Sequence, residues 1–421
     1  MKSFLIKFFL LAILAQTAVF AQTDDLESLF TNFQHFDLRD ALAKHKNDNS
    51  PEVLFYRGVV ANRFNDTKKS TEFLQKYLKK ADKNAPHLAE TYEVLADNYT
   101  KEFQYGKAAE AYKFLLDNFR GKLDISRIKG YENMFGLWNS LRKIAPQTVE
   151  FNGDSNIQGM RDTAKLLNIE VEIGAVKDNF VFDTGAGLST ITVSTANKLG
   201  LKIIEADVSV GSATDLNVKS KLAVAPVMKI GNITVRNAVF LVLEDKAMSF
   251  PQINYQIHGI IGFPVIHSLG KVSIAKDNHV AVFAKSAKSN LEPNMCLQGL
   301  MPIVAGFHQN KRLIFAFDTG AVSTDLYPPF FKANEAAITK DQTANKVKIG
   351  GAGGFREISA YRLSEVELNI GGKTAKLINA RVLTEQSNEN SRFYYGNLGQ
   401  DLIKQFDKMT LDFRTMQISF E

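Results

Sequence analysis

The sequence predicts a multidomain protein with an all-α N-terminal region followed by an all-β C-terminal region. Residues 24 to about 145 are rich in Leu, Ala, Lys, Glu and Phe, and their apolar residues recur at helical spacing. After Pro146, Val, Ile, Thr and Gly become frequent and apolar residues alternate with polar ones, as in 169–173 and 366–370. The β-rich part also repeats itself. We therefore expect a helical domain at 22–150 and two β units at 151–288 and 289–421.

Length and composition narrow the class of protein. The chain has 421 residues, of which 45% are hydrophobic and 23% charged, which is typical of a folded protein with two or three domains. The net charge of +6 is small for this length, and the Lys and Arg residues are spread along the chain. Because no nucleic-acid recognition motif accompanies them, we expect no nucleic-acid partner.

Residues 1–21 have the pattern of a signal peptide. Lys2 and Lys7 form a basic start before a short apolar run from Phe8 to Leu14, and Ala18 and Ala21 precede the expected cut before Gln22. The run is too short to span a bilayer comfortably, although a retained N-terminal anchor is the alternative. We expect an exported protein, periplasmic or extracellular, with no membrane span after removal of the signal.

The cysteine and histidine content gives no cofactor site. Cys296 is the single cysteine, so no intramolecular disulfide is possible, and no Gly-rich cysteine-protease signature surrounds it. His258 and His267 bracket Gly262 without the spacing of metal ligands. We interpret all of these as structural residues and expect no metal and no cofactor.

Part of the helical region has a more specific pattern. Seven residues fall at offsets 0, 3, 4, 7, 16, 20 and 23 and resemble a tetratricopeptide repeat, with small residues where two helices touch: Tyr92, Leu95, Ala96, Tyr99, Ala108, Tyr112 and Leu115. A weaker copy begins at Leu54 and Gly58. Three interpretations stay open: a platform that docks a protein partner, ordinary helical packing, or a prosegment that covers the β-rich part.

The β-rich part contains one unit twice. Residues 180–186 read FVFDTGA and residues 315–321 read FAFDTGA, so Asp183 and Asp318 lie 318 − 183 = 135 residues apart. Gly262 and Gly399 follow these aspartates by 262 − 183 = 79 and 399 − 318 = 81 residues, after Ile-Ile and Asn-Leu respectively. Four positions at +4, +9, +12 and +21 from each glycine also match: Ile266, Lys271, Ile274 and Phe283, and Ile403, Lys408, Leu411 and Phe420.

The repeated Asp-Thr-Gly triplet indicates hydrolytic chemistry. Gly185 and Gly320 permit a tight turn that exposes the carboxylate before them, and the hydroxyls of Thr184 and Thr319 can hold the loops. Two such carboxylates facing one water share a proton. The charged one takes a proton from water and the neutral one donates to the scissile carbonyl, with the proton belonging to the pair. The expected reaction is peptide hydrolysis without a metal or a covalent intermediate.

These motifs give the region from about 160 to 421 a resemblance to the pepsin and retropepsin superfamily of aspartic proteases, in a bacterial two-lobed form. The resemblance implies two β lobes with a substrate cleft between them and Asp183 and Asp318 as the catalytic pair. It also implies that Thr184 and Thr319 cross-link the two active-site loops. Strands ending in Gly262 and Gly399 are expected behind the aspartates.

The sequence also departs from the pepsin pattern. Ala186 and Ala321 follow the two glycines, where pepsins usually carry a serine that donates to the aspartate. Ser189 and Thr324 match the hydroxyl position that retropepsins keep, and we expect them to support the active-site loops. Because a lost donor removes one force that lowers the carboxyl pKa, we expect optimal activity at about pH 5–6.5.

Two hairpin flaps are expected to bind an extended peptide by adding it to the edge of a sheet. The candidates are Gly211 and Ser212 in the first unit and Gly351 and Gly353 in the second. No tyrosine of the pepsin kind occurs near the first. The glycine-rich second run lacks the Lys-Ser/Thr ending of a phosphate-binding loop.

The sequence therefore predicts a secreted aspartic endopeptidase that acts on a peptide or protein substrate. The alternative is a catalytically weak or inactive peptide-binding protein with a helical docking module. A third reading is a processing protease whose helical domain selects one client protein.

Overall fold

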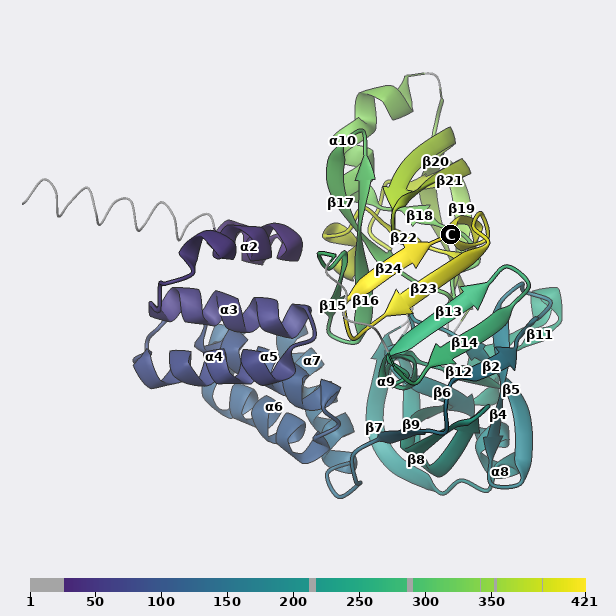
Figure 1. Cartoon of the computed structure of the whole chain (residues 1–421), viewed down its shortest axis with the longest axis horizontal. Helices are drawn as coiled ribbons and strands as arrows, with labels where there is room; N and C mark the ends of the chain where they lie inside the picture. The colour runs from purple at the N-terminus through teal and green to yellow at the C-terminus, as the bar shows by residue number, and fades with distance from the viewer. Residues whose placement is uncertain (1–25, 212–216, 286–290, 341, 352–353, 388) are drawn as a thin grey trace, which may run out of the picture.

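The computed structural model describes residues 26–211, 217–285, 291–340, 342–351, 354–387 and 389–421. It confirms a helical N-terminal region followed by a large β-rich region (Figure 1). The signal peptide expected at 1–21 lies outside the described residues. Within the described ranges, no helix is both long enough and apolar enough to cross a membrane.

The helical region consists of successive helices joined by short turns. Ser50, Asp66 and Asp124 accept a hydrogen bond from a first-turn N–H group and so begin α3, α4 and α7. Gly58 lies against Leu74, so the absence of a side chain lets α3 and α4 approach closely. The helices are α2 (His35–Leu42), η1 (Ala43–His45), α3 (Pro51–Arg63), α4 (Thr67–Lys80), α5 (Leu88–Lys101), α6 (Tyr105–Phe119), η2 (Arg120–Lys122) and α7 (Ile125–Ser140).

The first large sheet has nine strands: β1 (Thr148–Phe151), β3 (Met160–Arg161), β4 (Leu167–Ile173), β5 (Val176–Phe182), β6 (Ser189–Thr192), β7 (Ile203–Gly211), β8 (Asn217–Ile230), β9 (Ile233–Leu243) and β12 (Gly259–Ile261). Its order is β1-β9-β6-β12-β5-β4-β8-β7, with β3 on β4. Because β8 also pairs with β9, six of these strands form a closed ring. β7 is left as an edge strand.

The second large sheet has eight strands: β15 (Met295–Gln298), β16 (Met301–His308), β17 (Lys311–Phe317), β18 (Asp325–Leu326), β19 (Asn345–Gly351), β20 (Gly354–Ile370), β21 (Lys373–Leu383) and β22 (Gly396–Leu398). Its order is β15-β16-β17-β22-β18-β21-β20-β19, and the pairing of β16 with β20 closes a ring. The rings β4-β5-β12-β6-β9-β8 and β16-β17-β22-β18-β21-β20 have the same topology. The sequence repeat is therefore also a repeat of strand order.

A third sheet joins the two repeats. Its five strands are β2 (Ser155–Gln158), β14 (His279–Phe283), β13 (Lys271–Ala275), β23 (Lys408–Asp412) and β24 (Gln417–Phe420), in that order. β13 and β23 pair antiparallel, with Val272 opposite Leu411, and the hydroxyls of Ser273 and Thr410 are 2.8 Å apart. Most of the positions that match at fixed offsets from Gly262 and Gly399 fall on these strands.

The remaining elements are short. They are α8 (Val193–Lys198), η3 (Asp245–Met248), β10 (Ser249–Phe250), η4 (Pro251–Ile253), β11 (Tyr255–Gln256), α9 (Phe263–Ser268), α10 (Pro328–Thr339), η5 (Glu389–Arg392) and α11 (Gln400–Ile403).

The helical region contacts both repeats (Figure 1). Against the first sheet it presents apolar groups: Tyr105 stacks on Trp138 at 5.6 Å between ring centres, and both pack in one cluster with Val208 and Leu241. Against the second sheet, Phe36 of α2 packs in a cluster with β15 and β16. The helices thus bridge the two β units.

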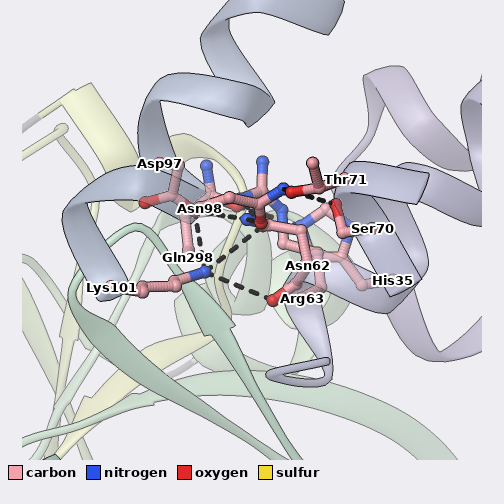
Figure 2. Close-up of polar contacts among 9 residues, drawn as sticks. All are labelled: His35, Asn62, Arg63, Ser70, Thr71, Asp97, Asn98, Lys101 and Gln298. Atoms are coloured by element: carbon pink, nitrogen blue, oxygen red, sulfur yellow. Dashed lines mark hydrogen bonds and ion pairs between the residues drawn. The ribbon is translucent and has the colours of Figure 1, made fainter. Parts of the chain in front are cut away.

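The contact with the second sheet also has a buried polar layer (Figure 2). Asp97 and Lys101 of α5 form an ion pair of 2.7 Å, and the Lys101 ammonium donates to the carbonyl of Asn62 at 3.2 Å. His35 of α2 lies 3.0 Å from the side-chain oxygen of Gln298 on β15. This layer joins three helices to the start of the second β unit.

Candidate active site

Each candidate aspartate follows a buried strand. β5 and β17 end in Phe182 and Phe317, which are inaccessible to solvent, and run parallel to β12 and β22. The backbone N–H of Asp183 donates to the carbonyl of Ile261, and that of Asp318 donates to the carbonyl of Leu398, both at 3.0 Å. The aspartates therefore occupy equivalent places in the two repeats, where a loop leaves a fixed strand.

The two loops are cross-linked by Thr184 and Thr319, both fully buried. Each threonine N–H donates to the other threonine's hydroxyl oxygen, at 3.0 Å in both directions. The Thr184 hydroxyl donates to the carbonyl of Phe317 at 2.9 Å, and the Thr319 hydroxyl donates to that of Phe182 at 2.7 Å. These four reciprocal bonds hold the loops against each other.

The glycines after the threonines let the carboxyl groups face one another. A Cβ atom added at Gly185 would meet the carboxyl group of Asp318, and one at Gly320 would meet that of Asp183. The structure thus brings together Asp183, Thr184, Gly185, Asp318, Thr319 and Gly320, all singled out from the sequence. Any side chain at either glycine would separate the pair.

Burial and mutual repulsion act on the acid–base behaviour of the pair. The pKa of Asp183 is raised well above its ordinary value, first by burial, then by the charge of Asp318 and a hydrogen bond shared with it. Hydrogen bonds from the N–H groups of Gly185 and Ala186 oppose this rise in pKa. A neutral carboxylic acid can therefore persist beside a carboxylate.

The two carboxyl groups differ in their hydrogen-bond donors. Oδ1 of Asp183 accepts from the N–H groups of Gly185 at 2.8 Å and Ala186 at 3.1 Å. Oδ1 of Asp318 accepts from the N–H of Gly320 at 2.8 Å, and its Oδ2 accepts from the side-chain amide of Asn397 at 2.9 Å. Asn397 was not predicted as a site residue. The available signal was the mismatch between Asn397-Leu398-Gly399 and Ile260-Ile261-Gly262.

Ser189 and Thr324 contact the strands behind the aspartates. The Ser189 hydroxyl accepts from the N–H of Gly262 at 3.0 Å, and the Thr324 hydroxyl accepts from that of Gly399 at 3.1 Å. Thr324 also donates to the carboxylate of Asp401 at 2.7 Å. Their hydroxyls thus tie each Asp-Thr-Gly loop to the glycine that follows β12 or β22.

The aspartate pair opens into a cavity of about 920 Å³. Two of its walls come from the two repeats, but a third comes from α5, α6 and α7 through Thr100, Tyr112, Met134, Leu137 and Trp138. The cavity lining is more apolar than polar, and its polar part comes from the aspartates, several hydroxyl and amide side chains and a few other charged groups. A helical cover over the β-rich part was one of the open interpretations of the sequence, but the residues that form this wall were not predicted.

The expected flap segments lie in equivalent hairpins. Gly211 ends β7 opposite Asn217 of β8, and Gly351 ends β19 opposite Gly354 of β20. Gly351 lines the cavity. Ser212 and Gly353 lie outside the described residues.

An aromatic contact links the second hairpin to the first repeat. Phe355 of β20 meets Phe250 of β10 edge to face, with ring centres 5.7 Å apart, and both rings line the cavity. Tyr255 of β11 adds a third ring and donates to Asp162 at 2.6 Å. These rings form an apolar wall that joins the two repeats beside the aspartates.

The helical region also binds the first hairpin directly. The side-chain amide of Asn133 on α7 donates to the carbonyl of Ser209 at 2.7 Å, and its oxygen accepts from the Ser209 N–H at 2.8 Å. β7 is an edge strand, so one amide side chain here takes the place of a neighbouring strand. Both residues line the cavity.

Cys296, His258 and His267 lie outside the aspartate site. Cys296 is buried on β15, and burial raises the pKa of its thiol to about 12. His267 is buried on α9, and burial lowers the pKa of its imidazole to about 4. A protonated thiol and a neutral imidazole are what structural core positions require.

Comparison with known proteins agrees with this geometry. Residues 169–265, from within β4 to within α9, match the model of a family described as aspartyl protease. No curated protein gives a significant match to the chain. The matched segment contains Asp183, its loop and the strand behind it. Residues 169–265 of the chain are therefore similar to an aspartyl protease domain.

Proposed function

We propose that this protein is an aspartic endopeptidase in which Asp183 and Asp318 activate one water molecule against a peptide carbonyl. The observation that carries the proposal is the reciprocal Thr184–Thr319 bonding, because it brings two equivalent Asp-Thr-Gly loops face to face. The repeats 151–288 and 289–421 would be the two lobes of the enzyme, with the cavity as the substrate cleft.

The proposed reaction needs one carboxylate and one carboxylic acid. The carboxylate takes a proton from water as the water oxygen bonds to the carbonyl carbon, and the acid protonates the carbonyl oxygen. Transfer of a proton to the amide nitrogen then breaks the C–N bond and releases an acid and an amine. The raised pKa of Asp183 keeps one proton on the pair toward neutral pH, which fits activity near pH 5–6.5.

The β7–β8 and β19–β20 hairpins would hold the peptide as an added strand. Gly350 and Gly351 line the cavity and permit close approach of a peptide backbone. The apolar wall from Phe250 and Phe355 would contact side chains of the bound peptide. The helices α5 to α7 would form the end of the cleft and could also carry a docking surface for a protein client, as a TPR-like region would.

The signal-peptide pattern of residues 1–21 supports a place of action outside the cytoplasm, periplasmic or extracellular. We propose that the mature protein begins at Gln22. Amino-terminal sequencing of protein recovered from the native host tests this directly. A chain that still begins at Met1 would contradict it.

The test of the enzyme proposal uses the purified chain with a diverse peptide mixture at pH 4, 5.5 and 7. We expect the wild type to generate new peptide termini, and Asp183→Asn and Asp318→Asn each to lose at least about 100-fold in rate. Asp277→Asn, in an exposed turn between β13 and β14, is the matched control and should behave as wild type.

The alternative function is peptide binding without cleavage. Calorimetric titration of the same peptides into wild type and Asp183→Asn separates the two. Tight binding by both proteins, with no new termini at any pH, would establish the binding protein and exclude the peptidase.

A further inference from the structure

The two aspartates sit in the same backbone frame but differ in one neighbouring side chain. β12 pairs Ile260 with Val181, two residues before Asp183. β22 pairs Asn397 with Ala316, two residues before Asp318. Ile260 and Asn397 thus occupy the same place in the two repeats, and both line the cavity. An aliphatic side chain stands beside one carboxyl group and an amide beside the other.

From this asymmetry we infer that Asn397 is a positioning residue that fixes which aspartate is ionised: Asp318 is the base and Asp183 is the acid. The inference rests on the proposed peptidase function and assigns roles within it. The side-chain nitrogen of Asn397 donates a hydrogen bond of 2.9 Å to Oδ2 of Asp318, and this bond favours the charged form of that carboxyl group. Ile260 offers no donor to Asp183.

The backbone donors do not by themselves favour Asp318 as the ionised group. Oδ1 of each aspartate accepts a backbone N–H at 2.8 Å, and Oδ1 of Asp183 accepts a second one, from Ala186, at 3.1 Å. The assignment rests on the side-chain donor. Asp318 alone receives a side-chain donor on its second oxygen among the bonds that the structure describes. The raised pKa of Asp183, caused first by burial and then by the charge of Asp318, has the direction expected of the protonated partner.

Other charged groups of the cavity do not favour the opposite assignment. Two of the carboxylates are paired with cations within the fold: Asp325 of β18 with Arg381 of β21 at 2.6 Å, and Asp97 with Lys101 on α5 at 2.7 Å. The further titratable groups in the lining are Lys348 on β19 and the phenols Tyr112, Tyr255 and Tyr327. Among the bonds described, Asn397 is the side-chain donor to the pair, so its replacement should change the titration of these two carboxyl groups.

The assignment fixes the route of each proton. Water gives a proton to the Asp318 carboxylate as its oxygen bonds to the carbonyl carbon, and Asp183 gives its own proton to the carbonyl oxygen. The resulting diol breaks down as Asp318 passes its proton to the amide nitrogen and the C–N bond cleaves. One diol hydroxyl returns a proton to Asp183, which restores the starting state.

The test measures the two carboxyl groups directly. Carbonyl ¹³C NMR of aspartate-labelled protein, assigned with Asp183→Asn and Asp318→Asn, gives the titration order of the pair without any need for catalysis. In the wild type we expect Asp318 to titrate at lower pH than Asp183. In Asn397→Leu, which keeps the shape of the side chain and removes the donor, the acidic titration should move up by about one to two pH units. The acidic limb of the kcat/KM profile should move with it.

A reciprocal variant and a control sharpen the outcome. The double variant Ile260→Asn with Asn397→Leu moves the donor to the other aspartate, and the titration order should reverse. Asn369→Leu removes an exposed amide from β20 in the same sheet and should change neither profile. Thermal melting and circular dichroism confirm that each variant is folded.

Each result decides the question. An Asp318 that titrates above Asp183 in the wild type, or an Asn397→Leu protein whose kcat falls with an unmoved pH profile, would overturn the positioning role. If the wild type cleaves no peptide but titrates in the expected order and responds to Asn397→Leu, the peptidase proposal fails while the role of Asn397 stands.

Discussion

At the scale of single residues, the buried pair of aspartates has a local cost in stability. The pKa of Asp183 is raised above its unfolded value, chiefly by burial, so the folded protein disfavours the ionised form. Between the unfolded and the folded pKa the folded state binds a proton that the unfolded state has lost, and stability falls as pH rises through this window. The site is therefore least favourable for folding at neutral and alkaline pH.

We expect Asp183→Asn to raise the melting temperature at pH 8 while it abolishes peptide cleavage. The amide oxygen can still accept the N–H groups of Gly185 and Ala186, and the repulsion from Asp318 is gone. Calorimetry at pH 5 and pH 8 should show a larger gain at the higher pH. An equal or lower melting temperature at pH 8 than wild type would contradict this account.

The threonine cross-link gives a second prediction. In Thr184→Val the hydroxyl that donates to Phe317 and accepts from Thr319 is lost, which leaves a carbonyl and an N–H buried without partners. We expect a loss of about 1–3 kcal/mol in the free energy of unfolding, measured by urea denaturation. The exposed Thr374→Val on β21 is the control, with a change within about 0.5 kcal/mol. Equal effects of the two substitutions would show that the cross-link adds no stability.

Site residues divide into those that sequence could predict and those that it could not. The aspartates, threonines and glycines were predictable because a repeated motif with fixed spacing forces equivalent positions. Asn397 was not predicted, because the same repeat encouraged treating Asn397 and Ile260 as equivalents. Where the two copies of the repeat differ, as at Asn397 and Ile260, the shared pattern gives no indication of the role of either residue.

At the scale of elements, the α7–β7 contact connects the helical region to the cleft. Asn133 bonds both the N–H and the C=O of Ser209, on the edge strand of the first hairpin. The helix therefore holds the hairpin at the distance where it lines the cavity. Sequence patterning indicated the helices and strands separately, but a helix periodicity does not reveal which strand the helix will cover.

We expect Asn133→Leu to weaken substrate binding more than chemistry. Loss of two hydrogen bonds frees β7, so KM should rise by about tenfold, equivalent to about 1.4 kcal/mol, with a smaller change in kcat. Hydrogen exchange at the Ser209 amide should accelerate by a similar factor. Asn139→Leu on the same helix serves as control, because the side-chain oxygen of Asn139 accepts a long bond of 3.4 Å from Arg142. Unchanged exchange at Ser209 would show that the contact does not restrain the strand.

At the scale of the whole molecule, two buried histidines make stability depend on pH. Burial lowers the pKa of His35 to about 3 and that of His267 to about 4, against an unfolded value near 6.5. As pH falls below 6.5, the unfolded chain binds protons that the folded chain refuses. The free energy of unfolding should therefore decrease toward pH 4, by up to about 1.4 kcal/mol per pH unit for each histidine.

Urea denaturation at pH 4.5, 5.5, 6.5 and 7.5 checks this slope. His267→Leu removes one titrating group from the core and should flatten the slope between pH 6.5 and 4.5. His258→Gln, at an exposed position, should leave it as in wild type. A slope in His267→Leu as steep as that of wild type would assign the acid sensitivity to other groups. Such acid sensitivity would also confine useful activity to the milder pH range expected from the sequence.

The large-scale arrangement was predictable in part. The change of composition and periodicity after Pro146 predicted a helical region followed by a β-rich region, because both properties depend on secondary structure. The repeated motif predicted two β units. The placement of the helices across both β units was not predictable, since it depends on side chains such as Phe36 and Trp138 whose partners lie far along the chain.

The reciprocal threonine bonds have a consequence for the order in which this molecule acquires its chemistry. Thr184 is held by Phe317, and the strand behind Asp318 ends only at Leu398. A chain that is synthesised from its N-terminus therefore cannot assemble the pair until the residues up to Leu398 are available. The two carboxyl groups therefore come together only after both copies of the repeat have been synthesised.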